Sequence, residues 1–543
     1  MNKVAHYLQD HLLGEVMDSS DARKYFATDN SIFSVLPTVV VYPFNEDDVR
    51  KSARFSWQLA ERGRIIPITA RGSGSDQTGA AIGSGIIIVF PAHLNRVVEY
   101  DGKTGLVVVE PGINYAKLQQ TLYTHSRFLP PFPASIEYST VGGAIANNAA
   151  GEKSIKYGDT RNYVKGLRVV LANGEVIETG PLSKRDLSKK LGLTTFEGEV
   201  YRSLDTLLEE NQDLIRGMGL NVSRSSAGYN LAEVKSKKDF DLTPLIVGSQ
   251  GTLGIVTEAI MATEIHNPGT TLAAGFFDNL ENVEKAIIEL KRLSDIPSAI
   301  EMVDETLLSL VDKLNPNLLK NVISKPFPKF ILFVEFDDLN DRTQKHLAKK
   351  ASKIFEKLAS KNQTETDEKS KDQLWKIRQA TSVVLNHSEG NLRPLPLIED
   401  GIVPVEKLAE FTKGLYDLFK KNRLQIAVWG HAGEGNLHVQ PFLDLSQIGD
   451  RQRIFRLMEE YYSMIIGLGG STSASHNDGR LRAPFLPKLY GDEVYALFQK
   501  VKKIFDPYNI LNPGVKIDVK LDDIKSILRH EYKNDNYANM LRS

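Results

Sequence analysis

The feature that most constrains the fold of this chain is a glycine-rich loop between two short apolar runs. Ile65–Thr69 is typical of a strand and Ile86–Phe90 of a returning strand, and the loop between them begins Arg71-Gly72-Ser73-Gly74-Ser75. Glycine lets backbone N–H groups approach phosphate oxygens closely, and a nearby arginine shares their charge. A surface turn that binds nothing is the alternative interpretation.

Spacing excludes two familiar phosphate loops. A dinucleotide fingerprint needs a glycine where this chain has Gln77. A P-loop needs Lys followed by Ser or Thr after Gly79, where two alanines stand. Upstream, a strand over Val39–Tyr42 and a helix capped by Asn45 and ended by Gly63 predict a β–α–β unit. The loop then lies at the carboxyl end of a strand, where α/β layers usually bind ligands.

Further stretches suit contact with a flat ligand. The prolines of 128–133 hold an extended backbone. The small residues of Thr140–Gly151 let two backbones, or a backbone and a cofactor, come into contact, with a helix–helix contact as the alternative. Asn173-Gly174 predicts a hairpin turn. Leu245–Val256 is interpreted as a buried strand that enters a third glycine-rich turn.

Composition narrows the classes of function. The 543 residues exceed what one core can organise. A formal net charge of -1 gives no electrostatic case for a nucleic-acid partner. The absence of cysteine excludes disulfides, thiolate zinc sites, iron–sulfur clusters held by the chain and cysteine-linked cofactors. No signal-peptide or membrane-spanning run is present, so a cytoplasmic protein is expected, with peripheral membrane contact left open.

From about residue 265 the pattern changes to alternating helices and strands. Helices are predicted over Val283–Leu293, Thr306–Leu314, Thr343–Ala359 and Leu374–Asn386, and strands over Ala299–Val303, Phe330–Phe336 and Leu424–Val428. This pattern indicates an antiparallel sheet with helices on one face. The polar run at 361–373 is predicted to be an exposed loop.

Two histidines flank a glycine turn in the second half of the chain. His431 and His438 lie at the ends of Gly430–His438, so a tight turn brings both imidazoles to one side. Such a pair favours a metal site about as much as a structural role, and two nitrogens need at least one further ligand.

Three motifs together resemble one flavoprotein family. RGSGSDQTG, PFPASIEYSTVGGAIANNAAGEKSIKYGDTRNYV and LIVGSQGTLGIVTEA occur in this order. They are similar to the FAD-binding domain of the vanillyl-alcohol oxidase/para-cresol methylhydroxylase (PCMH) family. Some members attach FAD to a histidine where this chain has Ser75, so the resemblance implies non-covalent FAD.

The resemblance implies that the first motif holds the pyrophosphate, the second passes along the flavin and the third contacts the adenosine half. The implied cofactor-binding residues are Arg71, Gly72, Ser73, Gly74, Ser75, Gly79, Pro133, Thr140, Val141, Gly142, Gly143, Ala146, Asn147, Gly151, Gly254, Ile255, Val256 and Asn512.

Further motifs resemble one branch of this family, the FAD-linked D-lactate, glycolate and D-2-hydroxyglutarate dehydrogenases. They include LWKIR, EDGIVP, GHAGEGNLH, SASHNDGRLR and FDPYNILNPG. The resemblance implies that His431 and His438 are metal ligands, that His476 is the general base and that Arg378 holds the substrate carboxylate. A forked guanidinium suits a carboxylate, and histidine suits proton removal near neutral pH. For Arg378 the alternative is a salt-bridged helix arginine.

One departure concerns the metal, Zn or Mn. The family usually reads Glu-His-Gly where this chain has Ser475-His476-Asn477, and that glutamate is a metal ligand in the metal-dependent members. Serine is a weak ligand for a divalent cation. Glu434, Asp478 or Glu399 could compensate, so the metal and the identity of the substrate stay open.

The expected fold is α+β, with a two-subdomain PCMH-type FAD domain and a substrate domain. The predicted boundaries are a helical segment (1–34), the FAD domain (35–264), the substrate domain (265–480), a segment returning to the FAD domain (481–517) and a polar tail (518–543). The expected reaction is oxidation of a D-2-hydroxy acid, D-lactate-like, to the 2-oxo acid, with electrons passing to a quinone, cytochrome or electron-transfer flavoprotein. Another alcohol substrate, a flavin-binding protein without turnover, and a homodimer remain open.

Overall fold

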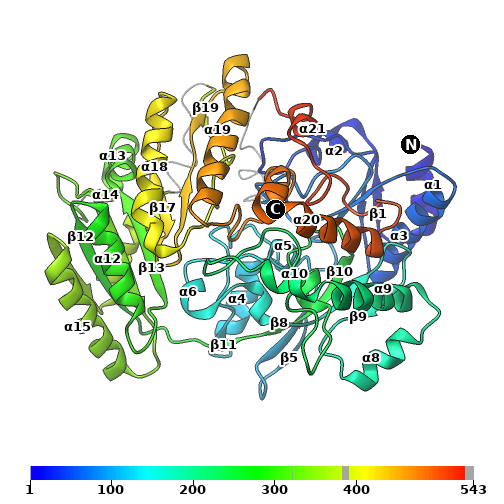
Figure 1. Cartoon of the computed structure of the whole chain (residues 1–543), viewed down its shortest axis with the longest axis horizontal. Coiled ribbons are helices and arrows are strands. Elements are labelled where there is room, and N and C mark those ends of the chain that lie inside the picture. Colours follow the sequence, from blue (N-terminus) through cyan, green and yellow to red (C-terminus); the bar gives the residue numbers. More distant parts are fainter. Residues whose placement is uncertain (1, 321, 382–390, 532–543) are drawn as a thin grey trace.

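The computed structural model describes residues 2–320, 322–381 and 391–531, and every structural statement below concerns those residues. In Figure 1 the chain forms two lobes, with the blue N-terminal elements on one side and, on the other, the green to yellow helices α12 (Leu280–Lys291), α13 (Glu305–Leu314), α15 (Asp341–Leu358) and α18 (Leu408–Lys421). Helices and mostly antiparallel sheets build both lobes, in agreement with the predicted α+β class.

The first sheet is built from N-terminal residues and carries the glycine-rich loop. Its elements are α1 (Lys3–His11), β1 (Glu15–Met17), α2 (Ser20–Tyr25), β2 (Val39–Tyr42), α3 (Glu46–Glu61), β3 (Ile68–Arg71) and β4 (Ile86–Val89). The strand order is β1-β2-β4-β3, with β2, β4 and β3 parallel. As predicted, Asn45 caps α3, because its side chain accepts a hydrogen bond from the Asp48 N–H at 3.2 Å. The loop therefore leaves the carboxyl end of a parallel strand.

The second sheet follows and is antiparallel, in the order β5-β6-β10-β8-β9. Its region contains β5 (Val97–Asp101), β6 (Leu106–Val109), α4 (Tyr115–Tyr123), β7 (Arg127–Phe128), α5 (Val141–Asn147), α6 (Ser154–Tyr157), α7 (Thr160–Tyr163), β8 (Val164–Val170), β9 (Val176–Glu178), α8 (Lys184–Leu191), α9 (Phe196–Glu210), α10 (Gln212–Gly217), α11 (Thr243–Ile246), β10 (Ile255–Ala262) and β11 (Glu264–Ile265). The predicted hairpin at Asn173-Gly174 joins β8 and β9.

The prediction for the third glycine-rich stretch was wrong in its order of elements. Residues Leu245 and Ile246 belong to the helical turn α11, and the buried strand β10 begins only at Ile255, after the glycines. Pro244 stands in the first turn of α11, where a missing N–H costs nothing. A short apolar run does not by itself distinguish a buried helical turn from a strand.

The third sheet has six strands in the order β15-β12-β14-β13-β17-β18, and all its neighbours are antiparallel. The elements of this lobe are β12 (Thr271–Phe277), α12 (Leu280–Lys291), β13 (Ala299–Asp304), α13 (Glu305–Leu314), α14 (Pro316–Leu319), β14 (Phe330–Phe336), α15 (Asp341–Leu358), β15 (Lys361–Glu365), α16 (Glu368–Gln379), β16 (Arg393–Pro394), α18 (Leu408–Lys421), β17 (Val428–His431), β18 (Asn436–Val439), β19 (Phe442–Leu443) and α19 (Ile448–Gly467).

Helices cover both faces of this sheet, not one face as predicted. Ala273 and Phe277 of β12 pack in the same core as α12, α15, α18 and α19. The alternate residues Leu272 and Ala274 pack with α13 and α16 in a separate core. Strand β14 shows the reason in its sequence, FILFVEF, in which apolar residues occupy both faces instead of alternating with polar ones.

Three boundaries in this lobe also differ from the predictions. Residues 361–365 form the edge strand β15, paired with β12, instead of a loop; an edge strand tolerates polar residues because one side is solvated. Strand β17 lies at Val428–His431, later than predicted, so His431 is on the strand. Helix α16 begins at Glu368, and the predicted helical residues 382–386 lie outside the described residues.

The C-terminal part returns to the first sheet. After α20 (Leu486–Phe505), the chain pairs Leu511 with Ile68 beside β3 and then reaches α21 (Leu521–Lys525). The Asn512 amide donates to the carbonyls of Ala80 and Gln250 at 2.9 and 2.8 Å. This return therefore ties two of the glycine-rich stretches together.

Candidate functional site

A cavity of about 690 Å³ lies between the lobe built from the first two sheets, called the FAD-type lobe after the resemblance noted above, and the six-stranded sheet. This size is usual for ligand sites. One wall is made by the glycine-rich stretches at 72–77, 133–150 and 249–256. The opposite wall is made by side chains of α16, β17, β18 and the loop before α20, including Arg378 and His476. The stretches singled out for a cofactor and for chemistry therefore share one cavity.

The loop at 72–77 offers unused hydrogen-bond donors. Within the described chain, none of the backbone N–H groups of residues 73–77 donates a hydrogen bond, and the buried Ser73 hydroxyl has no partner. The Asp76 carboxylate holds the loop from inside by accepting from the N–H groups of Thr78 and Ala80 at 2.9 and 2.8 Å. These N–H groups and the Ser73 hydroxyl are therefore available as donors, and such a glycine-rich loop fits the phosphate groups of FAD.

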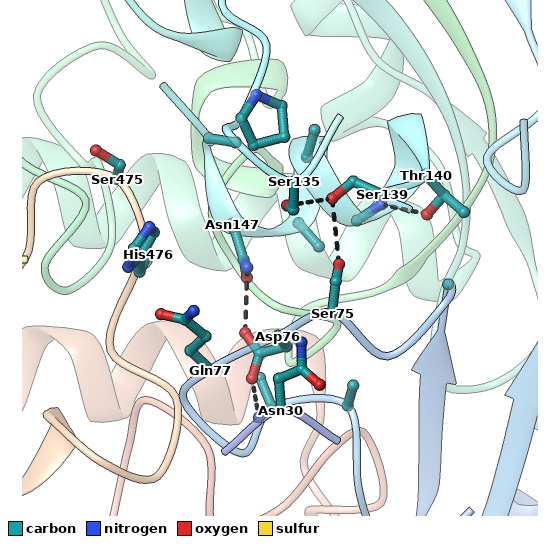
Figure 2. Close-up of a pocket in the computed structure, with 18 of the residues that line it drawn as sticks. Asn30, Ser75, Asp76, Gln77, Ser135, Ser139, Thr140, Asn147, Ser475 and His476 are labelled. Atoms are coloured by element: carbon teal, nitrogen blue, oxygen red, sulfur yellow. Dashed lines mark hydrogen bonds between the residues drawn. The ribbon is translucent and has the colours of Figure 1, made fainter. Parts of the chain in front are cut away.

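Figure 2 shows the first and second glycine-rich motifs meeting across this wall. The Ser75 and Ser139 hydroxyls lie 3.2 Å apart, and Ser139 in turn bonds Ser135 at 2.6 Å. The Asn147 amide donates to Asp76 at 3.1 Å. Ser75 thus faces the second motif as a hydrogen-bonding residue, where some members of the resembled family carry a flavin-linked histidine.

The structure separates the predicted cofactor residues into two groups. Those lining the cavity are Gly72, Ser73, Gly74, Ser75, Pro133, Thr140, Gly142, Gly143, Ala146, Asn147, Gly254, Ile255 and Val256. The remaining five, Arg71, Gly79, Val141, Gly151 and Asn512, lie behind the wall: the Arg71 guanidinium donates to the carbonyls of Thr28 and Ala81, and Val141 packs in a hydrophobic core. Their geometry supports the loops instead of presenting side chains to the cavity.

Gly72 is expected to be essential for this wall. A Cβ at Gly72 would overlap the Thr140 hydroxyl, which caps α5, so Gly72→Ala should push the first two motifs apart. We expect purified Gly72→Ala to hold less than about a tenth of the wild-type FAD, as read from the flavin absorbance per protein, because an overpacked contact costs roughly 1–3 kcal/mol. Gly217→Ala, with open space around the added carbon, is the matched control. Equal flavin content in both variants would contradict the close approach.

At the other end of the cavity, His476 is held by two carboxylates. Its Nδ1 lies 2.5 Å from Glu399 Oε1, and its backbone N–H donates to Asp400 Oδ2 at 2.7 Å. The ring is one-third exposed, and Nδ1 is engaged, so Nε2 is the nitrogen free to meet a ligand. In Figure 2, His476 and Ser475 enter the cavity from a loop opposite Asn147.

The carboxylates also set the charge of this imidazole. Burial lowers the pKa of His476, but the negative charges of Glu399 and Asp400 outweigh it and raise this pKa to about 9. The pKa of Glu399 moves the other way. Burial raises the pKa of this carboxylate, but His476 and the other nearby cations outweigh burial and lower it to about 2. Glu399 is therefore ionised and orients His476 as a carboxylate–imidazole pair.

Arg378 and His431 share a third buried carboxylate. Glu301 of β13 accepts from Arg378 Nε at 2.8 Å and lies 2.6 Å from His431 Nδ1. Burial, together with the charges of Arg224 and Arg378, lowers the pKa of His431 to about 3, so His431 is neutral and donates from Nδ1. Glu301 thus fixes one edge of the guanidinium while Arg378 still lines the cavity. The salt-bridge and substrate-binding interpretations of Arg378 are compatible.

Among the described residues, the predicted metal ligands His431 and His438 do not share a third metal-binding side chain. The rings of His431 and His438 lie 5.2 Å apart and nearly perpendicular. In the part of the chain that the structure describes, the one group of three suitable ligands is Glu399, His438 and His476, which excludes His431. Within that group, His476 already bonds Glu399.

Sequence reasoning missed Glu301 and Arg224. Glu301 stands between apolar residues in the strand AIEMVD, and a charged residue in a strand with no exposed face indicates a buried partner. Arg224 lies in the serine-rich stretch 222–226, which carries no periodic signal. The structure places it behind Ser475, where its Nη2 donates to the Ser475 hydroxyl at 3.2 Å.

Among the described residues, no helix combines the length and apolar character needed to cross a bilayer.

Comparison with known protein families finds one matching family model in each lobe. A FAD binding domain matches residues 37–180, and the C-terminal domain of FAD linked oxidases matches residues 267–515. Solved structures with the same fold include 4-ethylphenol oxidase from Gulosibacter chungangensis, with a TM-score of 0.67, 14% identity and coverage of 93% of this chain and 95% of that one. They also include p-cresol methylhydroxylase, with a TM-score of 0.66, 15% identity and coverage of 93% and 94%. The predicted PCMH-type architecture is confirmed.

Curated relatives extend over most of the chain. D-2-hydroxyglutarate dehydrogenase of Escherichia coli (strain K12) is 29% identical over 531 residues, which are 95% of this chain but 51% of the relative. Glycolate oxidase subunit GlcD of Bacillus subtilis (strain 168) is 29% identical, covering 92% of this chain and 93% of the relative. D-lactate dehydrogenase of Archaeoglobus fulgidus is 27% identical, covering 92% and 96%. The chain therefore spans about half the length of the first of these relatives.

Proposed function

We propose that this chain, which matches a FAD binding domain and the C-terminal domain of FAD linked oxidases, oxidises a D-2-hydroxy acid to the corresponding 2-oxo acid with non-covalently bound FAD. One observation carries this proposal: Arg378 and His476 line the same cavity as the glycine-rich wall that fits FAD. The names of the relatives, which are dehydrogenases or an oxidase subunit for D-2-hydroxyglutarate, glycolate and D-lactate, support the same class of substrate.

The side chains of the cavity suit the parts of a hydroxy acid. FAD, when bound, supplies the acceptor for the hydride that leaves the α-carbon. Arg378, held at Nε by Glu301, presents its guanidinium to the substrate carboxylate. His476, held at Nδ1 by Glu399, uses Nε2 to take the hydroxyl proton. Two carboxylates thus fix both groups before the substrate arrives, which lowers the cost of alignment.

The lining favours an acid with one carboxylate, such as D-lactate. Arg378 is the sole arginine or lysine among the described lining residues. The lining also contains Pro394, Pro396 and Trp429, which offer apolar contacts to a short side chain. A second carboxylate would lack a fixed cation there.

Electrons are proposed to leave the enzyme to a separate acceptor, namely a quinone, a cytochrome or an electron-transfer flavoprotein. The sequence contains no cysteine, so the chain offers no thiolates for an iron–sulfur cluster of its own.

The test is an anaerobic titration of purified protein with D- and L-lactate, glycolate and D-2-hydroxyglutarate, followed by the flavin absorbance. We expect D-lactate to bleach the oxidised band and acid precipitation to release the flavin into the supernatant. A yellow protein that none of these acids bleaches would favour another alcohol substrate or a flavin-binding protein without turnover. A protein that cannot be reconstituted with FAD would overturn the proposal.

The pH dependence of the reaction should report the charge around His476. A general base must be neutral, so kcat/KM is expected to rise with pH up to the raised pKa of about 9 and to level off above it. In Glu399→Gln a negative charge is lost, the pKa of His476 falls and the rising limb should move to lower pH. The measurement is kcat/KM for D-lactate from pH 6 to 10 in both proteins. A rising limb at the same pH in both would exclude His476 as the titrating group.

A further inference from the structure

Arg224 is a buried cation immediately behind the cavity wall. Its side chain is 5% exposed and forms an ion pair with Glu434, which is equally buried. The loop that carries it is anchored on both sides of the arginine: Ser223 Oγ donates to the Glu434 carbonyl at 3.2 Å, and Ser226 Oγ donates to the Ala474 carbonyl at 2.9 Å. The guanidinium is thus fixed against the segment that contains Ser475 and His476.

The hydrogen bond from Arg224 determines whether the Ser475 hydroxyl acts as a donor or as an acceptor toward the cavity. Arg224 Nη2 donates to Ser475 Oγ at 3.2 Å and to Asn436 Oδ1 at 3.4 Å. Ser475 therefore accepts from the guanidinium, and its own O–H is left to donate. Ser475 lines the cavity next to His476. A hydroxyl that accepts from a cation is a stronger donor, because the bonds polarise each other.

The carboxylates that could complete a metal site with His431 and His438 are already engaged. Glu434 pairs with Arg224. Asp478 accepts from Lys516 Nζ and from the Gly228 N–H, each at 2.8 Å. Glu399 lies 2.5 Å from His476 Nδ1. In the described chain His431 therefore belongs to no group of three metal-binding side chains. A divalent cation at the two histidines would also approach the guanidinium, which costs Coulomb energy in a buried site.

We propose that the positive charge of Arg224, which acts on the substrate through its hydrogen bond to the Ser475 hydroxyl, takes the place of a divalent metal in this site. Arg224 is a positioning residue: it fixes Ser475 as a donor to an oxygen of the substrate, while His431 and His438 act as metal-free wall residues. The oxidation then needs no divalent cation. The statement about the substrate oxygen rests on the proposed function, whereas the statement about the metal does not.

The first test measures metal content directly, independently of any substrate. Protein purified with FAD and dialysed against Zn²⁺ or Mn²⁺, then against metal-free buffer, is expected to retain less than about 0.1 metal per chain by plasma mass spectrometry. His438→Ala is treated in parallel to correct for ions elsewhere on the protein. One metal per wild-type chain that His438→Ala loses would overturn the proposal, even if no hydroxy acid reduces the flavin.

The second test removes the Ser475 hydroxyl while leaving the charge of Arg224 in place. Ser475→Ala should lower kcat/KM for the reducing acid about ten- to a hundredfold at unchanged FAD content, because a hydrogen bond supported by a charge is lost. Thr472→Val is the matched control, since this buried hydroxyl has no described partner and does not line the cavity. A Ser475→Ala enzyme as active as the control would overturn the role of the hydroxyl.

The charge itself is tested by a paired substitution. Arg224→Gln with Glu434→Gln removes both charges together and avoids an unpaired buried ion. We expect this double variant to keep FAD and to lose kcat/KM to a similar extent as Ser475→Ala, while Arg224→Lys retains most of it. If the double variant matches wild type, the charge of Arg224 plays no part. If it fails to fold, Ser475→Ala and the metal content still decide the proposal.

Discussion

His476→Ala is expected to lower the rate of flavin reduction by D-lactate about a thousandfold, within the range usual for loss of a general base. The physical reason is that Nε2 is the free nitrogen of an imidazole whose Nδ1 is held by Glu399. The measurement is stopped-flow reduction under anaerobic conditions at saturating acid, with FAD content determined on the same sample.

The control for this variant is His125→Ala, because His125 is exposed and lies outside the cavity. His476→Gln should be as slow as His476→Ala, since glutamine keeps volume but accepts no proton. A His476→Ala enzyme that reduces at the wild-type rate would exclude the base assignment, and loss of FAD in this variant alone would instead indicate a cofactor contact.

Arg378→Met is expected to raise KM for D-lactate by a factor of about a hundred or more, because truncating one partner of a buried charge pair costs roughly 2–5 kcal/mol. The loss has two parts: the substrate carboxylate loses its forked donor, and Glu301 loses the cation that partners it at 2.8 Å. The measurement is a full Michaelis–Menten analysis with protein of known FAD content.

Two further variants separate these parts. Arg378→Lys keeps a cation for Glu301 but not the planar fork, so KM should remain raised while the thermal stability is close to wild type. Arg378→Met with Glu301→Gln removes the uncompensated carboxylate, and its stability should recover while KM stays high. Recovery of KM along with stability would indicate that Arg378 acts only as a salt-bridge residue.

Much of the FAD-type lobe could be predicted from sequence, because its signals are local. Glycine loops follow their strands, the Asn45 cap is three residues from its N–H partner, and Asn173-Gly174 marks a tight turn. The same local reasoning failed at Leu245–Ile246, where a short apolar run suits either a strand or a helical turn. It also failed for the six-stranded sheet, because covering one face or both depends on helices distant in the sequence.

The main residues of the candidate site could be predicted from the sequence, but the residues that they pair with could not. His476 and Arg378 stand in motifs, and the structure brings both to one cavity. Their partners lie 77 residues away in each case, Glu399 for His476 and Glu301 for Arg378. Arg224 is 251 residues from Ser475. Such pairings arise from the tertiary fold, and periodicity in a single sequence carries no record of them.

The return of the C-terminal segment has a consequence for how the protein is made. Asn512 bonds Thr69, Ala80 and Gln250, so the glycine-rich stretches are supported by a residue 443 positions after Thr69 of β3. During synthesis, which proceeds from the N-terminus, the glycine-rich loops emerge long before this support exists. The nascent chain therefore lacks these bonds to the flavin pocket until Asn512 has emerged from the ribosome, and we expect stable cofactor binding to follow that point.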